Sequence, residues 1–133
     1  MLLQLLVGTL ISVINIGLHA LVTVLAVAIA RRAGLRPTKW PRLHLMGVMI
    51  ATAVVLMISH AFEILVWSAT YLALRAVAAD SDILYFAFVN YTTLGYGDYL
   101  PSGGLEFFAA VEALVGVVMI SFITVVFARK FIR

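Results

Sequence analysis

The chain has 133 residues, of which 65% are hydrophobic and only 11% are charged, and its mean hydropathy is +1.16. This composition excludes an ordinary water-soluble domain and indicates a membrane protein. The formal net charge is +3, but the basic residues form short clusters beside apolar runs, so they do not indicate a nucleic-acid-binding surface. There are no cysteines, which excludes disulfides and thiolate metal sites.

Three apolar stretches are long enough to cross a bilayer. The first, residues 1–30, would reach about 40 Å as a helix, against a hydrocarbon core of about 30 Å. The second covers residues 44–76 and the third residues 104–128. The segment 81–92 between them carries an apolar run that is too short to cross, which is typical of a re-entrant helix buried by protein. The sequence therefore predicts an all-α membrane protein with three transmembrane helices per subunit.

Basic residues are concentrated in the loop 31–43 and at the C-terminal end. They are Arg31, Arg32, Arg36, Lys39 and Arg42 in the loop, and Arg129, Lys130 and Arg133 at the end. By the positive-inside rule both segments are expected to be cytoplasmic, so the N-terminus is expected outside. We therefore expect a multi-pass protein of the plasma or bacterial inner membrane with a cytoplasmic C-terminus. Trp40, Tyr71 and Tyr99 are predicted to act as interfacial anchors.

Residues 92–98 read Thr-Thr-Leu-Gly-Tyr-Gly-Asp and follow the predicted short helix. Gly95 and Gly97 can take positive φ without a Cβ penalty. Such residues are needed where successive backbone carbonyls turn toward one axis to replace the water of a dehydrated cation. A bare Gly-Tyr-Gly would be explained by a tight turn, but the full run between two spanning helices favours an ion-binding filter.

This run and its setting resemble the selectivity filter of tetrameric potassium channels, and the resemblance covers residues 44–133. It implies an outer helix (44–76), a pore helix (81–92), a filter (93–98) and an inner helix (104–128), with four copies around a common axis in the bilayer. No cofactor is implied apart from the transported K⁺ itself. The implied K⁺ ligands are the carbonyls of Thr93, Leu94, Gly95 and Tyr96 and the hydroxyl of Thr93, with Gly97 completing the filter.

The resemblance also implies roles around the filter. Asp98 would place one negative charge per subunit at the outer mouth, Tyr85 could offer its hydroxyl to Asp98, and Thr92 would support the filter. Val89 stands where some family members carry a glutamate behind the filter, so that support is missing. Asp80, Ser81 and Asp82 are suited to cap the pore helix.

Two features of the inner helix follow from the same comparison. Gly116 falls near the family's hinge position, although a small residue there could equally permit close helix packing. A stripe of residues spaced for one helix face is suited to line the pore, the alternative being packing against neighbouring helices. This stripe consists of Val117, Ile120, Thr124 and Ala128.

Ionisable residues occur inside the predicted spans, where they are costly and usually face the protein interior. His60 and Glu63 lie three residues apart on one face of the second helix, His19 lies on the first helix and Glu112 on the third. They could form interhelical hydrogen bonds, act as a proton-sensitive gating element, or, for His19, His60 and Glu63, bind a metal such as zinc. Because ligands on different helices cannot be placed from sequence, these alternatives stay open.

The main functional hypothesis is a homotetrameric potassium-selective channel. A weakly selective cation channel and a non-conducting modulatory membrane subunit are the alternatives. No nucleophile–base pair or catalytic metal constellation stands out, so an enzyme is not expected. The first helix, residues 1–30, lies outside the resemblance and has no assigned role.

Overall fold

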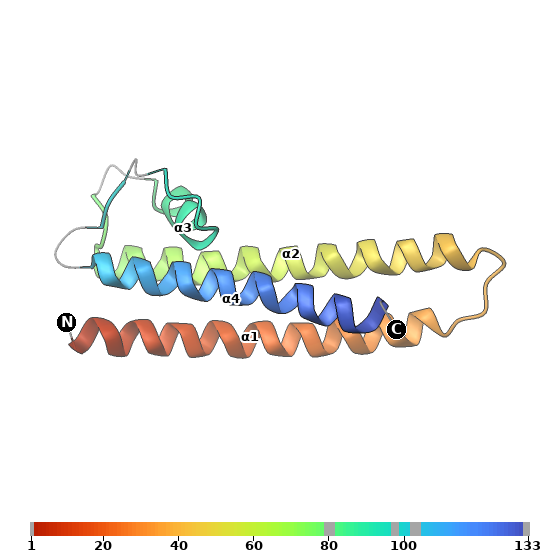
Figure 1. Cartoon of the computed structure of the whole chain (residues 1–133). Helices are drawn as coiled ribbons and strands as arrows, with labels where there is room; N and C mark the ends of the chain where they lie inside the picture. Colours follow the sequence, from red (N-terminus) through yellow and green to blue (C-terminus); the bar gives the residue numbers. More distant parts are fainter. Residues whose placement is uncertain (1, 79–81, 97–98, 102–104, 132–133) are drawn as a thin grey trace.

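The computed structural model describes residues 2–78, 82–96, 99–101 and 105–131. For residues 3–5 and 122–131 it describes the backbone alone. The described residues form four α-helices and no strand, so the expected all-α fold is confirmed. Three long helices lie side by side in an elongated bundle, and a short one packs at the end where the N-terminus lies (Figure 1). They are α1 (Leu2–Gly34), α2 (Pro41–Leu74), α3 (Ile83–Tyr91) and α4 (Glu106–Phe131).

The helix ends differ from the predicted ones by a few residues, for identifiable reasons. The helix α1 continues to Gly34, so Arg31 and Arg32 lie in its last turn, where positive charge is favourable beside the free carbonyls. The helix α2 starts at Pro41, whose fixed φ and missing N–H suit the first helical position. It ends at Leu74 because Arg75 takes a left-handed conformation (φ 50°).

The short helix α3 has the properties expected of a pore helix. Its nine residues span about 14 Å, which is too short to cross a bilayer. Asp82 caps its N-terminus by accepting a hydrogen bond from the backbone N–H of Tyr85 at 3.0 Å. The other two residues of the predicted capping cluster, Asp80 and Ser81, lie outside the described residues.

An aromatic cluster holds α3 between α2 and α4. The ring of Tyr71 on α2 packs edge-on against Phe86 of α3, with ring centres 5.0 Å apart, and against Phe108 of α4 at 5.5 Å. Trp67, one turn earlier on α2, contacts Phe108 at 5.2 Å. Edge-to-face pairs are directional, so the Tyr71–Phe86 pair helps to position α3 on α2, while the other two pairs join α2 to α4.

The helix α1 packs against both α2 and α4 with an unusual distribution of polarity. Its buried face carries the polar side chains of Ser12, Asn15, His19 and Thr23, whereas its exposed face is largely leucine, valine and isoleucine. This pattern suits a helix in lipid, where polar groups are sheltered by protein. Two segments, Leu6–Gly34 and Pro41–Leu74, are long and apolar enough to cross a membrane.

Candidate functional site

The predicted filter begins where α3 ends. Thr92 is the C-terminal cap of α3 and has an ordinary helical φ of −79°. The next residues differ, because Thr93 has φ 59° and Gly95 has φ 57°. Gly95 therefore uses the conformational freedom that the sequence predicts for it. The positive φ of Thr93 was not predicted, because a β-branched residue rarely takes this conformation. Neither Leu94 nor Tyr96 has positive φ, so the sign of φ alternates along the four residues.

Backbone hydrogen bonds explain this conformation. The N–H groups of Leu94 and Gly95 both donate to the carbonyl of Val89, at 3.0 and 3.3 Å, and the N–H of Thr93 donates to the carbonyl of Asn90 at 3.0 Å. All described peptide bonds are trans, so each carbonyl points opposite to the N–H of the following residue. The carbonyls of Thr93 and Leu94 therefore point away from α3.

The side chains of the same loop are largely exposed in the single chain. Leu94 is 54% exposed and Tyr96 is 64% exposed. Gly97 and Asp98 lie outside the described residues, and so does the expected contact between Tyr85 and Asp98. The ring of Tyr85 packs edge-on against Tyr99, with ring centres 6.5 Å apart.

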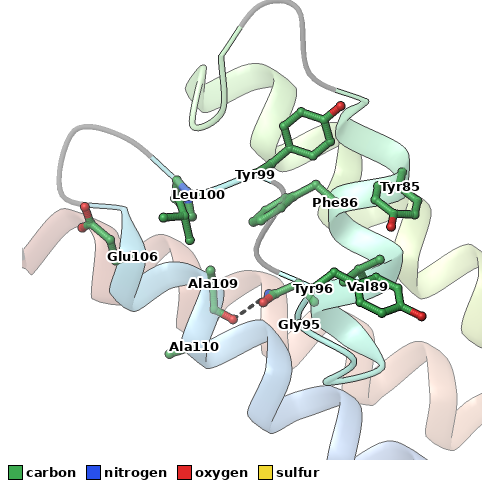
Figure 2. A pocket seen from close by; sticks show the side chains of 12 residues that line it. Tyr85, Phe86, Val89, Gly95, Tyr96, Tyr99, Leu100, Glu106, Ala109 and Ala110 are labelled. Carbon is green, nitrogen blue, oxygen red and sulfur yellow. Dashed lines mark hydrogen bonds between the residues drawn. The ribbon is translucent and has the colours of Figure 1, made fainter.

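A cavity of about 330 Å³ lies between the filter and α4 (Figure 2). Val89, Gly95 and Tyr96 line one side of it, and Ala109 and Ala110 of α4 line the other. Val89 is the residue that stands where the resemblance implies a supporting glutamate behind the filter. The side chains around the filter thus leave space at that point instead of filling it.

The carboxylate of Glu63 on α2 joins three helices and is buried. Its Oε1 lies 2.9 Å from His19 Nδ1 on α1 and accepts a hydrogen bond from Ser59 at 3.2 Å. Its Oε2 lies 3.3 Å from His60 Nδ1. The same oxygen accepts a hydrogen bond from the hydroxyl of Tyr91, the last residue of α3. The ring of His60 stacks on that of His19, with centres 5.1 Å apart. The interhelical hydrogen bonds considered from sequence are therefore present.

A second buried carboxylate, Glu112 on α4, holds the neighbouring residue of α3. Its Oε2 accepts hydrogen bonds from the Tyr71 hydroxyl and from the Asn90 side-chain amide, each at 2.5 Å. The same amide donates to the carbonyl of Ala109 at 2.8 Å. Tyr71 is fully buried, so its predicted role as an interfacial anchor is wrong. Together the two carboxylates fix the C-terminal end of α3, from which the filter starts.

Gly116 of α4 lies directly against this end of α3. A Cβ at residue 116 would come within 2.0 Å of the Tyr91 carbonyl oxygen. This contact supports the close-packing interpretation of Gly116, whereas its role as a hinge stays a prediction. Of the predicted pore-lining stripe, Val117 and Ile120 lie on the exposed face of α4. The side chains of Thr124 and Ala128 fall outside the described residues.

Removal of the Tyr91 hydroxyl should destabilise the protein. In Tyr91→Phe the buried Glu63 carboxylate loses a donor, and an unsatisfied buried group costs about 1–3 kcal/mol. We expect a lower apparent Tm in detergent. The matched control is Tyr99→Phe, whose hydroxyl lies outside both carboxylate clusters and which should melt like the wild type. Equal melting temperatures for Tyr91→Phe and wild type would contradict the role assigned to this hydrogen bond.

Sequence reasoning missed three residues of the site: Tyr71, Asn90 and Tyr91. A signal for Tyr71 was present, because His60, Glu63 and Tyr71 recur at intervals that place them on one face of a helix. Asn90 is also the one side-chain amide in an otherwise apolar α3. The carboxylates that these residues contact, Glu63 on α2 and Glu112 on α4, are identified only by the packing of the helices.

The structure thus combines long apolar helices with a short helix, α3, that is followed directly by a loop of alternating φ sign. A family model described as an ion channel matches residues 43–133, which is more than half of the chain. The chain therefore belongs to this ion channel family, which is not a family of enzymes, and it lies in a membrane. The matched region contains almost all of α2 and every later residue, and leaves α1 outside. No match was found among curated proteins or among solved structures.

Proposed function

We propose that this ion channel conducts K⁺ selectively and passively through a homotetrameric pore. The observation that carries the proposal is the backbone of residues 92–95, whose amides bond back to α3 so that the Thr93 and Leu94 carbonyls turn the other way. Rows of carbonyls of this kind replace the hydration shell of K⁺ in selectivity filters. We assign the K⁺ ligands to Thr93, Leu94, Gly95 and Tyr96.

The function is tested by flux from purified, tag-free protein in liposomes under opposed K⁺ and Na⁺ gradients. A reversal potential close to the K⁺ equilibrium value supports the proposal. A reversal potential near zero would favour the second candidate, a weakly selective cation channel, and the cavity beside Val89 is the observation behind that candidate. Absence of any flux would favour the non-conducting modulatory subunit and count against both channels.

The proposed assembly is a tetramer of identical chains. One chain supplies a single row of backbone carbonyls. Carbonyls can surround an ion on a common axis only when several copies of the chain contribute such rows. The exposed side chains of Leu94 and Tyr96 beside these carbonyls are consistent with further copies packing around this loop. We expect a mass of four times the 14.5 kDa chain by native mass spectrometry in detergent. Monomers and dimers alone would contradict the tetramer.

We propose three membrane crossings, made by α1, α2 and α4. The 26 residues of α4 span about 39 Å, enough for a hydrocarbon core of about 30 Å. The N-terminus lies at the same end as α3, opposite the basic connection between α1 and α2 (Figure 1). We therefore place the N-terminus and filter outside and the C-terminus in the cytoplasm. A reporter active only in the cytoplasm should be silent at the N-terminus and active at the C-terminus; activity at both ends would contradict this topology.

A further inference from the structure

The helix α1 lies outside the matched channel region, yet it brings a histidine to the channel's buried carboxylate. One nitrogen or oxygen from each of His19, His60 and Glu63 lies within 4.8 Å of the others. The side chains of His19 and Glu63 are only 2% and 1% exposed, and that of His60 is 15% exposed. We propose that these three residues form a binding site for a divalent cation of the zinc class, which joins α1 to α2 behind the filter.

The donor set suits zinc. Two imidazole nitrogens and one carboxylate oxygen are the protein ligands of a well-known type of zinc site, in which a water or another group takes the fourth position. Both histidines present Nδ1 to the carboxylate, and either imidazole nitrogen can bind a metal. The site contains no thiolate, so the softer metals that prefer sulfur are not favoured.

The spacing also suits zinc. Ligands about 2.0–2.1 Å from a tetrahedral zinc ion are about 3.3 Å from one another. His60 Nδ1 lies 3.3 Å from Glu63 Oε2, and His19 Nδ1 lies 2.9 Å from Glu63 Oε1. The two histidines approach different oxygens of Glu63, and the three donors lie within 4.8 Å of one another, so side-chain shifts would bring them around one ion.

Surrounding groups hold the carboxylate in place. Ser59 donates to one oxygen of Glu63, and the Tyr91 hydroxyl donates to the other. Outer partners of this kind orient metal ligands and raise affinity. The charge balance points the same way: among the described residues, the only ion-pair partners of Glu63 are these two histidines, which carry no charge when they bind a metal. A bound dication would compensate the carboxylate in a place where an unpaired charge is costly.

The test is equilibrium dialysis of the full-length, tag-free tetramer, first stripped with a chelator, against chelator-buffered zinc. We expect one zinc per chain in the wild type. His19→Gln should lower the affinity at least about 100-fold, because loss of even an outer partner typically costs 10–100-fold. The matched control is His44→Gln, which removes the one remaining histidine of the chain; this residue contacts the Ala33 carbonyl, away from the cluster.

Two further measurements keep the test independent of folding defects. His19→Cys supplies a different zinc ligand at the same position and should bind zinc far more tightly than His19→Gln. X-ray absorption at the zinc edge should show nitrogen and oxygen ligands at about 2.0–2.1 Å in the wild type. The proposal is overturned if the folded wild-type tetramer binds no zinc, or if His19→Gln and His44→Gln bind it equally. None of these outcomes depends on ion selectivity, so the channel proposal is tested separately.

Discussion

Gly95→Ala should abolish K⁺-selective conduction while leaving the helices folded. At residue 95 the nearest atom to an added Cβ, the Thr93 carbonyl oxygen, is 3.9 Å away, so space does not forbid alanine. The backbone does, because φ is 57° and a non-glycine residue in this conformation costs about 1–2 kcal/mol. Thr93 already carries a similar cost two residues earlier, and in the proposed tetramer each of the four subunits would add a second one.

The measurement is the reversal potential in liposomes under opposed K⁺ and Na⁺ gradients. The matched control is Gly17→Ala on α1, where an added Cβ meets no atom within 4 Å and φ is not positive. The control should conduct like the wild type. Wild-type selectivity in Gly95→Ala would remove the filter assignment, because the site would then not depend on a left-handed backbone at residue 95.

Gly116→Ala should have the largest effect on stability. The added Cβ would overlap the backbone carbonyl of Tyr91, at 2.0 Å from its oxygen and 3.0 Å from its carbon. A backbone atom at the end of α3 cannot move aside without disturbing the hydrogen bonds of Asn90 and Tyr91. We expect a loss of at least about 3 kcal/mol, the upper end of the usual range for overpacking, with little tetramer recovered.

Tetramer yield and apparent Tm in detergent measure this effect. Gly47→Ala on α2 is the matched control, since an added Cβ there meets no atom within 4 Å. The control should be neutral or stabilise the helix by up to about 1 kcal/mol. If Gly116→Ala assembles and melts like Gly47→Ala, then α3 and α4 do not meet as closely as described.

The order and type of the helices could be predicted from the sequence because hydrophobic length and the filter motif are local signals. Asp82 was identified as a cap for the same reason, since its partner is only three residues away. The pairing of polar groups could not be predicted in this way. His19 and Glu63 are separated by 44 positions, and their contact depends on how α1 docks. The expected hydrogen bond between Tyr85 and Asp98 stays a prediction. The proton-sensitive gating considered for His60 and Glu63 also stays a prediction.

The conformation of Thr93 could not be predicted for a different physical reason. The local conformational preference of threonine disfavours positive φ. In a sequence, positive φ is expected mainly at glycine. Here tertiary contacts prevail, because the N–H groups of Leu94 and Gly95 are both drawn to the carbonyl of Val89. Strained residues of this kind tend to lie at functional sites, which agrees with the position of Thr93 in the proposed filter.

If α1 crosses the membrane as proposed, its polar buried face has a consequence for how deeply this helix sits in the bilayer. His19 precedes Arg31 by twelve residues, or about 18 Å of helix, slightly more than half of a hydrocarbon core of about 30 Å. When Arg31 and Arg32 reach the headgroups, His19 therefore lies near the midplane, level with Glu63. A slip of one helical turn would move α1 by about 5.4 Å and bring Asn15 or Thr23, the next polar residues of the buried face, toward Glu63 in place of His19. The contact between the His19 ring and the Glu63 carboxylate is thus made at one height of α1 and is lost at the neighbouring ones.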